Sequence, residues 1–276
     1  MAFEIQAHRG SRAFFPENSI EAFCKAADSG VRVIELDLVV SCDHQLVVSH
    51  DPWISGPLCT APGGTPLAPE DRDRYLIYTM DYAEIAAFGC GLPDPGFPDQ
   101  QRTTACKPLL TDVFREVDAY MRARNLPGTM IFNIELKSWP ERDRILHPEP
   151  ELYAFLVVGQ LRLCGMLPRV RLQSFDFRLV EEVRKLCPEI AFGILADDLA
   201  RIHAFMERMP FLPAYVNPYY LLMGEELVAQ LHRKGIRVIP WTVNLPEEML
   251  AMKRMGADGI ITDYPELALR LDGLFA

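Results

Sequence analysis

The sequence has no long apolar run, no closely spaced cysteine pair and no excess of basic side chains. No apolar stretch approaches the roughly 20 residues that cross a bilayer, which excludes a membrane-spanning helix and with it stable membrane insertion. Lys and Arg number 28 against 38 Asp and Glu, so the formal net charge is −10. Nucleic-acid binding needs a basic surface that neutralises phosphates, and the acidic balance therefore argues against a nucleic-acid partner.

The seven cysteines are odd in number, widely spaced and without a Cys-x-x-Cys pair. Neither a zinc ribbon nor a disulfide framework is indicated. We expect reduced, mostly buried thiols and a cytoplasmic location. The N-terminal residues lead directly into an expected strand, without the basic and apolar segments of a signal peptide, although a leader already removed would leave no trace.

The composition is that of an ordinary globular protein, with 49% hydrophobic and 24% charged residues in a chain of 276. Short β-rich segments alternate with longer amphipathic segments almost from end to end. The expected strands are 3–7, 33–40 with 46–49 as its extension, 130–136, 170–173, 190–195, 214–217, 238–241 and 259–261. The expected helices are 18–28, 111–125 with Thr111 as its N-cap, 149–164, 176–187, 198–209, 224–234, 246–255 and one from 265.

This alternation of strands and helices over about 250 residues predicts an α/β fold of the TIM-type (β/α)8 barrel class, with a doubly wound parallel sheet as the alternative. Residues 1–276 form one expected catalytic domain. Residues 52–110 interrupt this alternation of strands and helices. They hold nine of the 22 prolines and contain one expected short helical piece near 81–88. This segment is either a functional insertion over the carboxyl ends of the strands or a passive surface elaboration.

Two expected strands carry polar side chains at alternate positions. Period-two alternation places Glu35 and Asp37 on one face of the second strand, and Asn133, Glu135 and Lys137 on one face of a later strand. Carboxylates within an apolar strand are poorly solvated and repel each other unless a cation lies between them. Glu35, Asp37 and Glu135 are therefore candidate oxygen ligands for one divalent cation, Mg²⁺ or Ca²⁺. The alternative is a solvated sheet face with surface ion pairs.

Two histidines, His8 and His50, each end an apolar run at an expected strand end. Paired near a metal, they suit acid–base chemistry at neutral pH. The other four histidines are expected at surface positions: His44, His147, His203 and His232.

Aromatic and amide side chains form a weaker set of candidates. Trp241 and Phe177 are expected to line an apolar wall of a substrate site, with Trp53 contributing from the insertion, although aromatics at strand ends also serve as core. Gln173 and Asn217 lie at strand ends, where they either reach substrate hydroxyls or cap neighbouring helices.

A set of motifs occurs in order over nearly the whole chain. They are His8-Arg9-Gly10, Pro16-Glu17-Asn18-Ser19, Ile34-Glu35-Leu36-Asp37, His50-Asp51, Lys107-Pro108-Leu109-Leu110, Asn133-Ile134-Glu135-Leu136-Lys137, Gln173-Ser174-Phe175-Asp176, Trp241-Thr242-Val243-Asn244 and Gly256-Ala257-Asp258-Gly259 with its continuation to Pro265. In these motifs the sequence closely resembles the glycerophosphodiester phosphodiesterase family.

The resemblance implies a TIM-type barrel that hydrolyses small-molecule glycerophosphodiesters to an alcohol and glycerol 3-phosphate with a divalent ion. It implies these roles: Glu35, Asp37 and Glu135 bind the metal, His8 and His50 act as acid and base, and Arg9 and Lys137 hold the phosphate. It also implies a two-step reaction, in which the glycerol 2-hydroxyl attacks phosphorus and water then opens the cyclic phosphate.

The segment after His50-Asp51 departs from the family pattern, because residues 52–59 lack the arginine that is common there and the insertion is longer and richer in proline. Substrate choice is the property most affected. One alternative is a phospholipase that acts on lysolipids or related phosphodiesters. Another is an inactive barrel that only binds phosphoesters, although every matching position holds a competent residue.

Overall fold

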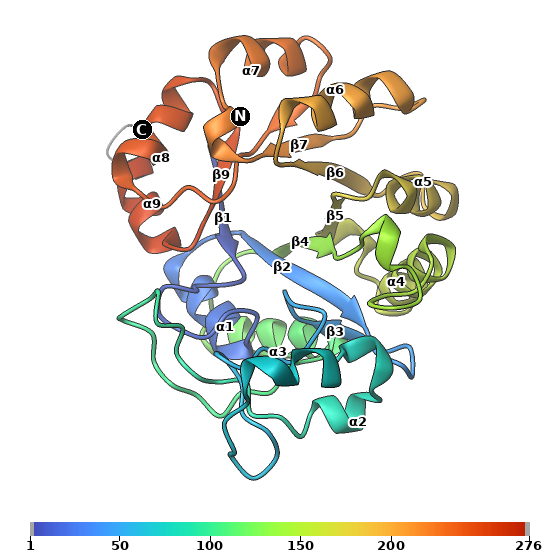
Figure 1. Cartoon of the computed structure of the whole chain (residues 1–276). Coiled ribbons are helices and arrows are strands. Elements are labelled where there is room, and N and C mark those ends of the chain that lie inside the picture. The colour runs from blue at the N-terminus through green and yellow to red at the C-terminus, as the bar shows by residue number, and fades with distance from the viewer. Residues whose placement is uncertain (1–2, 274–276) are drawn as a thin grey trace.

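Eight parallel strands follow one another around a nearly closed barrel in the computed structural model, which describes residues 3–273 (Figure 1). Their order is β8-β7-β6-β5-β4-β2-β1-β9. The strands are β1 Glu4–His8, β2 Val33–Val40, β4 Ile131–Leu136, β5 Val170–Ser174, β6 Ala191–Ala196, β7 Tyr215–Pro218, β8 Arg237–Val238 and β9 Gly259–Thr262. Backbone hydrogen bonds from Asp258 to Val238 (2.8 Å) and from Ile261 to Pro240 (2.9 Å) join the two ends. The predicted barrel is confirmed, and the doubly wound alternative was wrong.

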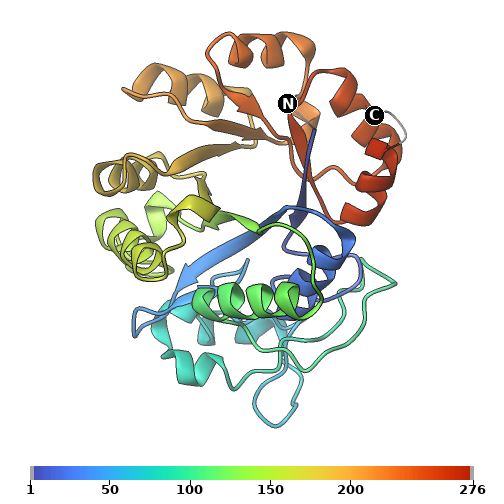
Figure 2. The same ribbon diagram turned by 180° about the vertical axis from the view of Figure 1, so that it is seen from behind.

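Helices surround this barrel on the outside, as Figure 1 and the view from behind in Figure 2 show. They are α1 Ile20–Ser29, α3 Leu110–Ala123, α4 Pro150–Leu163, α5 Phe177–Leu186, α6 Leu199–Arg208, α7 Glu225–His232, α8 Pro246–Arg254 and α9 Pro265–Gly273. Alternate strand residues, such as Ile34, Leu36 and Phe132, are fully buried in the layer between strands and helices. Between residues 3 and 273, no helix combines the length and the apolar character that a membrane crossing requires.

Local sequence signals account for where α1 begins and ends. The Ser19 hydroxyl oxygen accepts a hydrogen bond from the backbone N–H of Ala22 (3.1 Å), and Gly30 ends the helix at φ 94°. The prediction for α3 was wrong in one detail. That helix begins at Leu110, so Leu109 is its N-cap and Thr111 lies within the first turn.

The insertion of residues 52–110 carries its own small apolar core. Its short helices are η1 Pro69–Arg74, η2 Ile77–Thr79 and α2 Tyr82–Ile85, the last within the predicted helical piece. Ile54, Ile77, Ile85 and Phe88 form a cluster with Val39 and Val47, which lie on β2 and on β3 Leu46–Val48. β3 pairs with β2 in an antiparallel manner, and the insertion lies beside α1 and α3 (Figure 1).

The expectation of reduced, mostly buried thiols was wrong. Cys59 and Cys90, 31 residues apart, form a disulfide within the insertion. Among the five free cysteines, Cys187 is buried, whereas Cys42 and Cys164 are exposed. Disulfides are typical of oxidising compartments, so the expected cytoplasmic location loses the argument on which it was based.

At the amino end of the barrel strands, two arginines hold Glu4. The Arg171 guanidinium binds both Glu4 carboxylate oxygens (2.6 and 2.9 Å), and an Arg237 nitrogen lies 3.6 Å from one of them. Burial works to raise the pKa of Glu4, but the arginines outweigh it and lower the pKa below its ordinary value. This ion cluster therefore stabilises the fold when Glu4 is ionised.

We expect the Glu4→Gln variant to lose about 1–3 kcal/mol of unfolding free energy at pH 7, because two arginines lose their carboxylate partner. Since the pKa of Glu4 is lower in the folded state, its contribution is present above the unfolded pKa of about 4.3 and disappears as the pH falls through the folded value. Urea unfolding at pH 7 and at pH 3 measures this, with the exposed Glu225→Gln as control. An equal loss at both pH values would contradict the interpretation.

Candidate active site

A cavity of about 130 Å³ lies at the carboxyl ends of the strands. The predicted site residues that line it are His8, Arg9, Glu35, His50, Glu135, Lys137, Gln173 and Trp241. Asp37 is almost fully buried and does not line the cavity, and Phe177 lies in a neighbouring cavity. The barrel thus brings residues from six strands or strand ends to one place.

Three carboxylates form the acidic centre of the site. The register of β2 and β4 pairs Asp37 with Glu135 and Glu35 with Asn133. One oxygen from each of Glu35, Asp37 and Glu135 lies within 4.8 Å of the other two. Burial, together with the two neighbouring carboxylates, raises the pKa of Glu35 well above its ordinary value. The donor set fits a hard divalent cation such as Mg²⁺ or Ca²⁺, which would relieve this repulsion.

Two cationic side chains border the same carboxylates. The Lys137 Nζ atom lies 2.8 Å from Glu135 and 3.6 Å from Asp37, and the Arg9 Nε atom lies 3.2 Å from Asp37. Burial works to raise the pKa of Asp37, but the surrounding cationic groups, Arg9 foremost, hold it well below its usual range. Asn18 donates a 2.9 Å hydrogen bond to Asp37 and fixes its carboxylate. Asp37 is therefore an oriented, ionised carboxylate.

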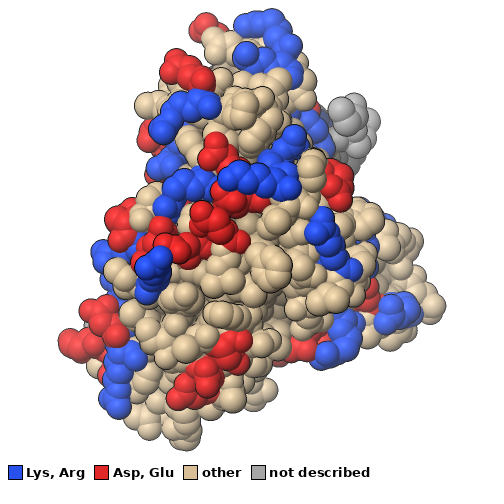
Figure 3. All heavy atoms as spheres, turned by 90° about the vertical axis from the view of Figure 1, so that its right-hand side faces the viewer, with Lys and Arg blue, Asp and Glu red and all other residues tan. Residues whose placement is uncertain are grey.

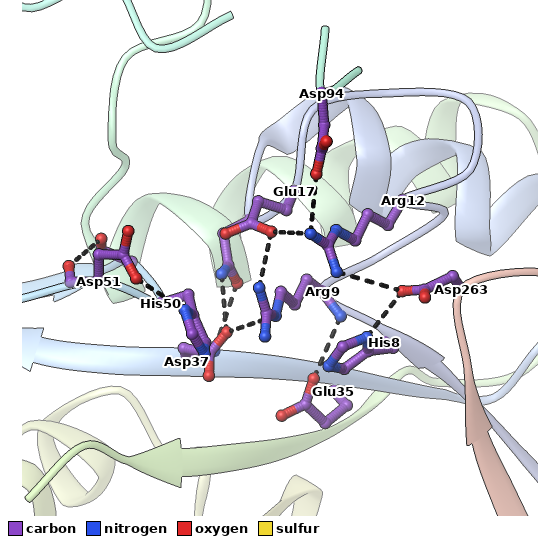
Figure 4. Close-up of polar contacts among 12 residues, drawn as sticks. His8, Arg9, Arg12, Glu17, Glu35, Asp37, His50, Asp51, Asp94 and Asp263 are labelled. Carbon is purple, nitrogen blue, oxygen red and sulfur yellow. Dashed lines mark hydrogen bonds and ion pairs between the residues drawn. The ribbon is translucent and has the colours of Figure 1, made fainter. Parts of the chain in front are cut away.

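The turn after β1 aims Arg9 at the site (Figure 4). Arg9 adopts φ 53° and Gly10 φ 86°, and a Cβ atom on Gly10 would lie 2.7 Å from the Ala22 carbonyl carbon, so only glycine fits there. The Arg9 backbone N–H donates to Glu35 (3.1 Å), and its guanidinium donates to Glu17 (2.7 Å). Glu17 thus holds the guanidinium beside the acidic centre.

Each site histidine is held by a carboxylate through its Nδ1 atom (Figure 4). Nδ1 of His8 lies 2.7 Å from Asp263, and Nδ1 of His50 lies 2.9 Å from Asp51. Because an ionised carboxylate only accepts hydrogen bonds, Nδ1 carries the proton and Nε2 of the neutral ring is free to accept one. Asp263 is ionised, since His8 and Arg12 lower its pKa to about 2 against the effect of burial.

The two histidines differ in exposure. The His8 side chain is 12% exposed and that of His50 is 34% exposed. Burial lowers the pKa of His8 below its ordinary value, although Asp263 works in the opposite direction. His8 is therefore neutral at neutral pH.

A sequence profile describing the glycerophosphoryl diester phosphodiesterase family matches residues 8–267. The chain belongs to this family. The match includes both histidines, Arg9, the three carboxylates and Lys137. As a glycerophosphoryl diester phosphodiesterase family member, the protein is a phosphoric diester hydrolase that acts on glycerophosphodiesters.

Related family members cover nearly the whole chain. A glycerophosphodiester phosphodiesterase of Caldanaerobacter subterraneus is 27% identical over 97% of this chain and 96% of its own. A human protein named as a lysophospholipase D is 26% identical over 94% of this chain and 82% of its own. A crystal structure from Silicibacter pomeroyi, described as a putative glycerophosphoryl diester phosphodiesterase, has 29% identity and a TM-score of 0.84 over 99% of this chain and 94% of its own.

In this glycerophosphoryl diester phosphodiesterase family member, Gln173 and Asn217 lie inside the barrel rather than at helix ends. Gln173 donates to Glu35 (3.1 Å) and accepts hydrogen bonds from Asn133 (3.1 Å) and from Asn217. The amides therefore connect β4, β5 and β7 beneath the site and fix the Glu35 carboxylate.

The aromatic wall differs from the predicted one. The Phe175 ring meets the Trp241 ring edge-on at 5.8 Å between centroids, and both line the cavity. Phe177 packs against Phe205 at 5.0 Å, and Trp53 lies beneath the Arg72 guanidinium, 3.7 Å from it. Trp241 is therefore accompanied at the site by Phe175 rather than by the two other predicted aromatics.

Sequence reasoning gave no role to Glu17, Asp51, Asp263 or Arg12, although the first three lie in the family motifs. The only feature of the sequence that could have identified them is their position within or beside a motif at a strand end. The surface expectation for His147 was wrong. Its ring is buried, its Nε2 accepts from the Trp139 N–H (2.8 Å), and its Nδ1 lies 2.9 Å from the Pro148 carbonyl oxygen.

Proposed function

We propose that the protein hydrolyses glycerophosphodiesters to an alcohol and sn-glycerol 3-phosphate, with a divalent cation and with His8 and His50 as the acid–base pair. The observation that carries this proposal is the joint placement of both histidines and the acidic centre at one cavity. A carboxylate at Nδ1 fixes the orientation of each ring, so Nε2 is the atom that exchanges a proton.

The residues divide the chemistry between them. Glu35, Asp37 and Glu135 would hold the cation, which when bound offsets the negative charge that develops on the phosphate oxygens. Arg9 and Lys137, which lie beside the same carboxylates, bind the phosphate oxygens. Their carboxylate partners keep both cationic groups oriented before the substrate arrives.

Proton transfer is the task of the histidines. One ring, neutral, accepts at Nε2 the proton of the glycerol 2-hydroxyl as that oxygen bonds to phosphorus. The other ring starts doubly protonated and donates its Nε2 proton to the alcohol oxygen as the bond between that oxygen and phosphorus breaks. In the second step the roles reverse: a water proton is accepted, water oxygen bonds to phosphorus, and the 2-hydroxyl regains its proton as the cyclic ester opens.

The test is release of glycerol 3-phosphate from glycerophosphocholine and glycerophosphoethanolamine by metal-stripped protein, with and without added Mg²⁺ or Ca²⁺. We expect release that depends on the added ion. No release from either diester with any ion would overturn the proposal.

A second candidate, cleavage of lysolipids, is favoured by apolar side chains at the same end of the barrel. Ile145, Leu199, Leu221 and Leu245 are exposed, and they follow β4, β6, β7 and β8 respectively. Such side chains suit contact with an aggregated amphiphile. Lysophosphatidylcholine in the same assay, at concentrations below and above micelle formation, distinguishes the two substrate classes.

We propose further that the insertion borders the substrate entrance within a single catalytic domain. Asp94 forms a 3.0 Å ion pair with Arg12, and Gln100 donates a 2.6 Å hydrogen bond to the Arg12 carbonyl oxygen. The Arg12 guanidinium also lies 3.0 Å from Glu17 and 3.8 Å from Asp263 (Figure 4). These contacts connect the insertion to the groups that hold Arg9 and His8.

A further inference from the structure

A second cavity of about 650 Å³ adjoins the site, and Phe175 lines both cavities. Its walls come from the segments after β4 and β5, from α5 and from α6 as far as its last turn. The first cavity, at about 130 Å³, is smaller than the 300–1,000 Å³ typical of sites that enclose a whole small molecule. A diester whose phosphate lies between Arg9 and Lys137 therefore needs further space for one of its two halves.

Neighbouring residues of the segment after β4 also line the two cavities, Lys137 the first and Trp139 the second. The Lys137 Nζ atom lies 5.7 Å from the centre of the Trp139 ring, and Trp139 lines the second cavity. The backbone of Trp139 is fixed by its hydrogen bond to the buried His147 ring (2.8 Å). A group that leaves the phosphate on this side meets an ordered aromatic side chain.

Two of the three arginines in the second cavity are already neutralised. The Arg178 guanidinium binds Asp143 and Asp176, each at 2.7 Å. Arg201 pairs with Asp197 at 3.2 Å and donates to the Phe175 carbonyl oxygen at 2.9 Å. The side of the molecule with α4, α5 and α6 accordingly shows acidic and basic side chains intermixed (Figure 3).

The remaining charges of the second cavity are two carboxylates and one guanidinium. Glu141, Glu181 and Arg208 are exposed, and none has an ion pair among residues 3–273. The surplus is therefore negative, and it lies beside the aromatic rings of Trp139 and Phe177. Carboxylates and aromatic faces together attract an ammonium group.

We propose that the second cavity is the subsite for the departing alcohol and that it favours an alcohol with an ammonium group. The inference rests on the proposed function, since it assigns the two halves of the same diester to the two cavities. Glu141, Glu181 and Trp139 attract the ammonium group, and Arg208 opposes it.

The test compares kcat/KM for glycerophosphocholine, whose alcohol is cationic, with kcat/KM for glycerophosphoglycerol, whose alcohol is neutral. In the Glu141→Gln/Glu181→Gln double variant, we expect kcat/KM for glycerophosphocholine to fall about fivefold. In Trp139→Leu it should fall by a similar factor. Arg208→Gln should gain about twofold with the cationic alcohol, because a like charge is removed. The neutral diester should react unchanged in the two variants that alter charge, as both diesters should in the exposed control Glu225→Gln.

The opposite signs at Glu141 and Arg208 separate recognition of charge from loss of structure. The subsite would be overturned if the ratio of kcat/KM for the two diesters stayed the same in the variants, or if the double variant gained kcat/KM for glycerophosphocholine. Either result would leave the proposed reaction intact. If the unmodified protein with added ion cleaves neither diester, the reaction and the subsite both fail.

Discussion

His50→Ala and His8→Ala are each expected to lower kcat by about 10²–10⁴-fold, the usual contribution of a positioned acid or base. Arg9 and Lys137 remain in both variants, so KM should change far less than kcat. Steady-state release of glycerol 3-phosphate at saturating ion measures both constants. His203→Ala, an exposed position on α6, is the matched control.

A glycerophosphodiester of p-nitrophenol makes this experiment sharper. This alcohol departs without a proton, so the variant that lacks the acid should recover much of its rate, whereas the variant that lacks the base should not. Near-normal rates with glycerophosphocholine in both variants would remove the two histidines from the mechanism.

Removal of the divalent ion by a chelator is expected to lower turnover by on the order of 10²–10³-fold, because a bound cation supplies several kcal/mol of transition-state stabilisation. Glu135→Gln should raise the ion concentration that gives half-maximal rate. Loss of a residue that only supports a metal ligand lowers metal affinity by about 10–100-fold, and loss of a ligand itself should lower it at least as much. Titration of Mg²⁺ and Ca²⁺ against activity and against tryptophan fluorescence measures the shift.

The tryptophan fluorescence titration measures ion binding independently of catalysis. The exposed Glu225→Gln should titrate like the unmodified protein. An unchanged titration in Glu135→Gln would show that Glu135 is not a ligand, and full activity after chelation would exclude a required ion.

The period-two pattern predicted which side chains of β2 and β4 point into the barrel, because it depends only on strand geometry. Ile34 and Leu36 face the helices, which leaves Glu35 and Asp37 directed into the barrel. Periodicity does not place Phe177, which belongs to α5 and lines the second cavity. β5 ends at Ser174 and α5 begins at Phe177, so Phe175 stays at the strand end and lines the site.

Contacts between distant parts of the chain could not be predicted from local patterns. His8 and Asp263 are 255 residues apart, and Arg12 and Asp94 are 82 apart. Each pair meets because the barrel returns to its first strand or because the insertion folds against the turn after β1. Cys59 and Cys90 meet for a similar reason, inside the insertion. Such pairs follow from topology rather than from sequence spacing.

The core of residues 52–110 has a consequence for how this enzyme can change. Most of its apolar side chains and its covalent cross-link lie within the segment, and Val39 of β2 and Val47 of β3 complete the cluster, so the segment can vary where these two contacts are kept. Exchange for a relative's segment requires apolar contacts to Val39 and Val47 and a partner for Arg12 such as Asp94. Because we propose that this segment borders the substrate entrance, its variation is a route by which evolution and protein engineering can alter substrate choice while the strands that carry the site are kept.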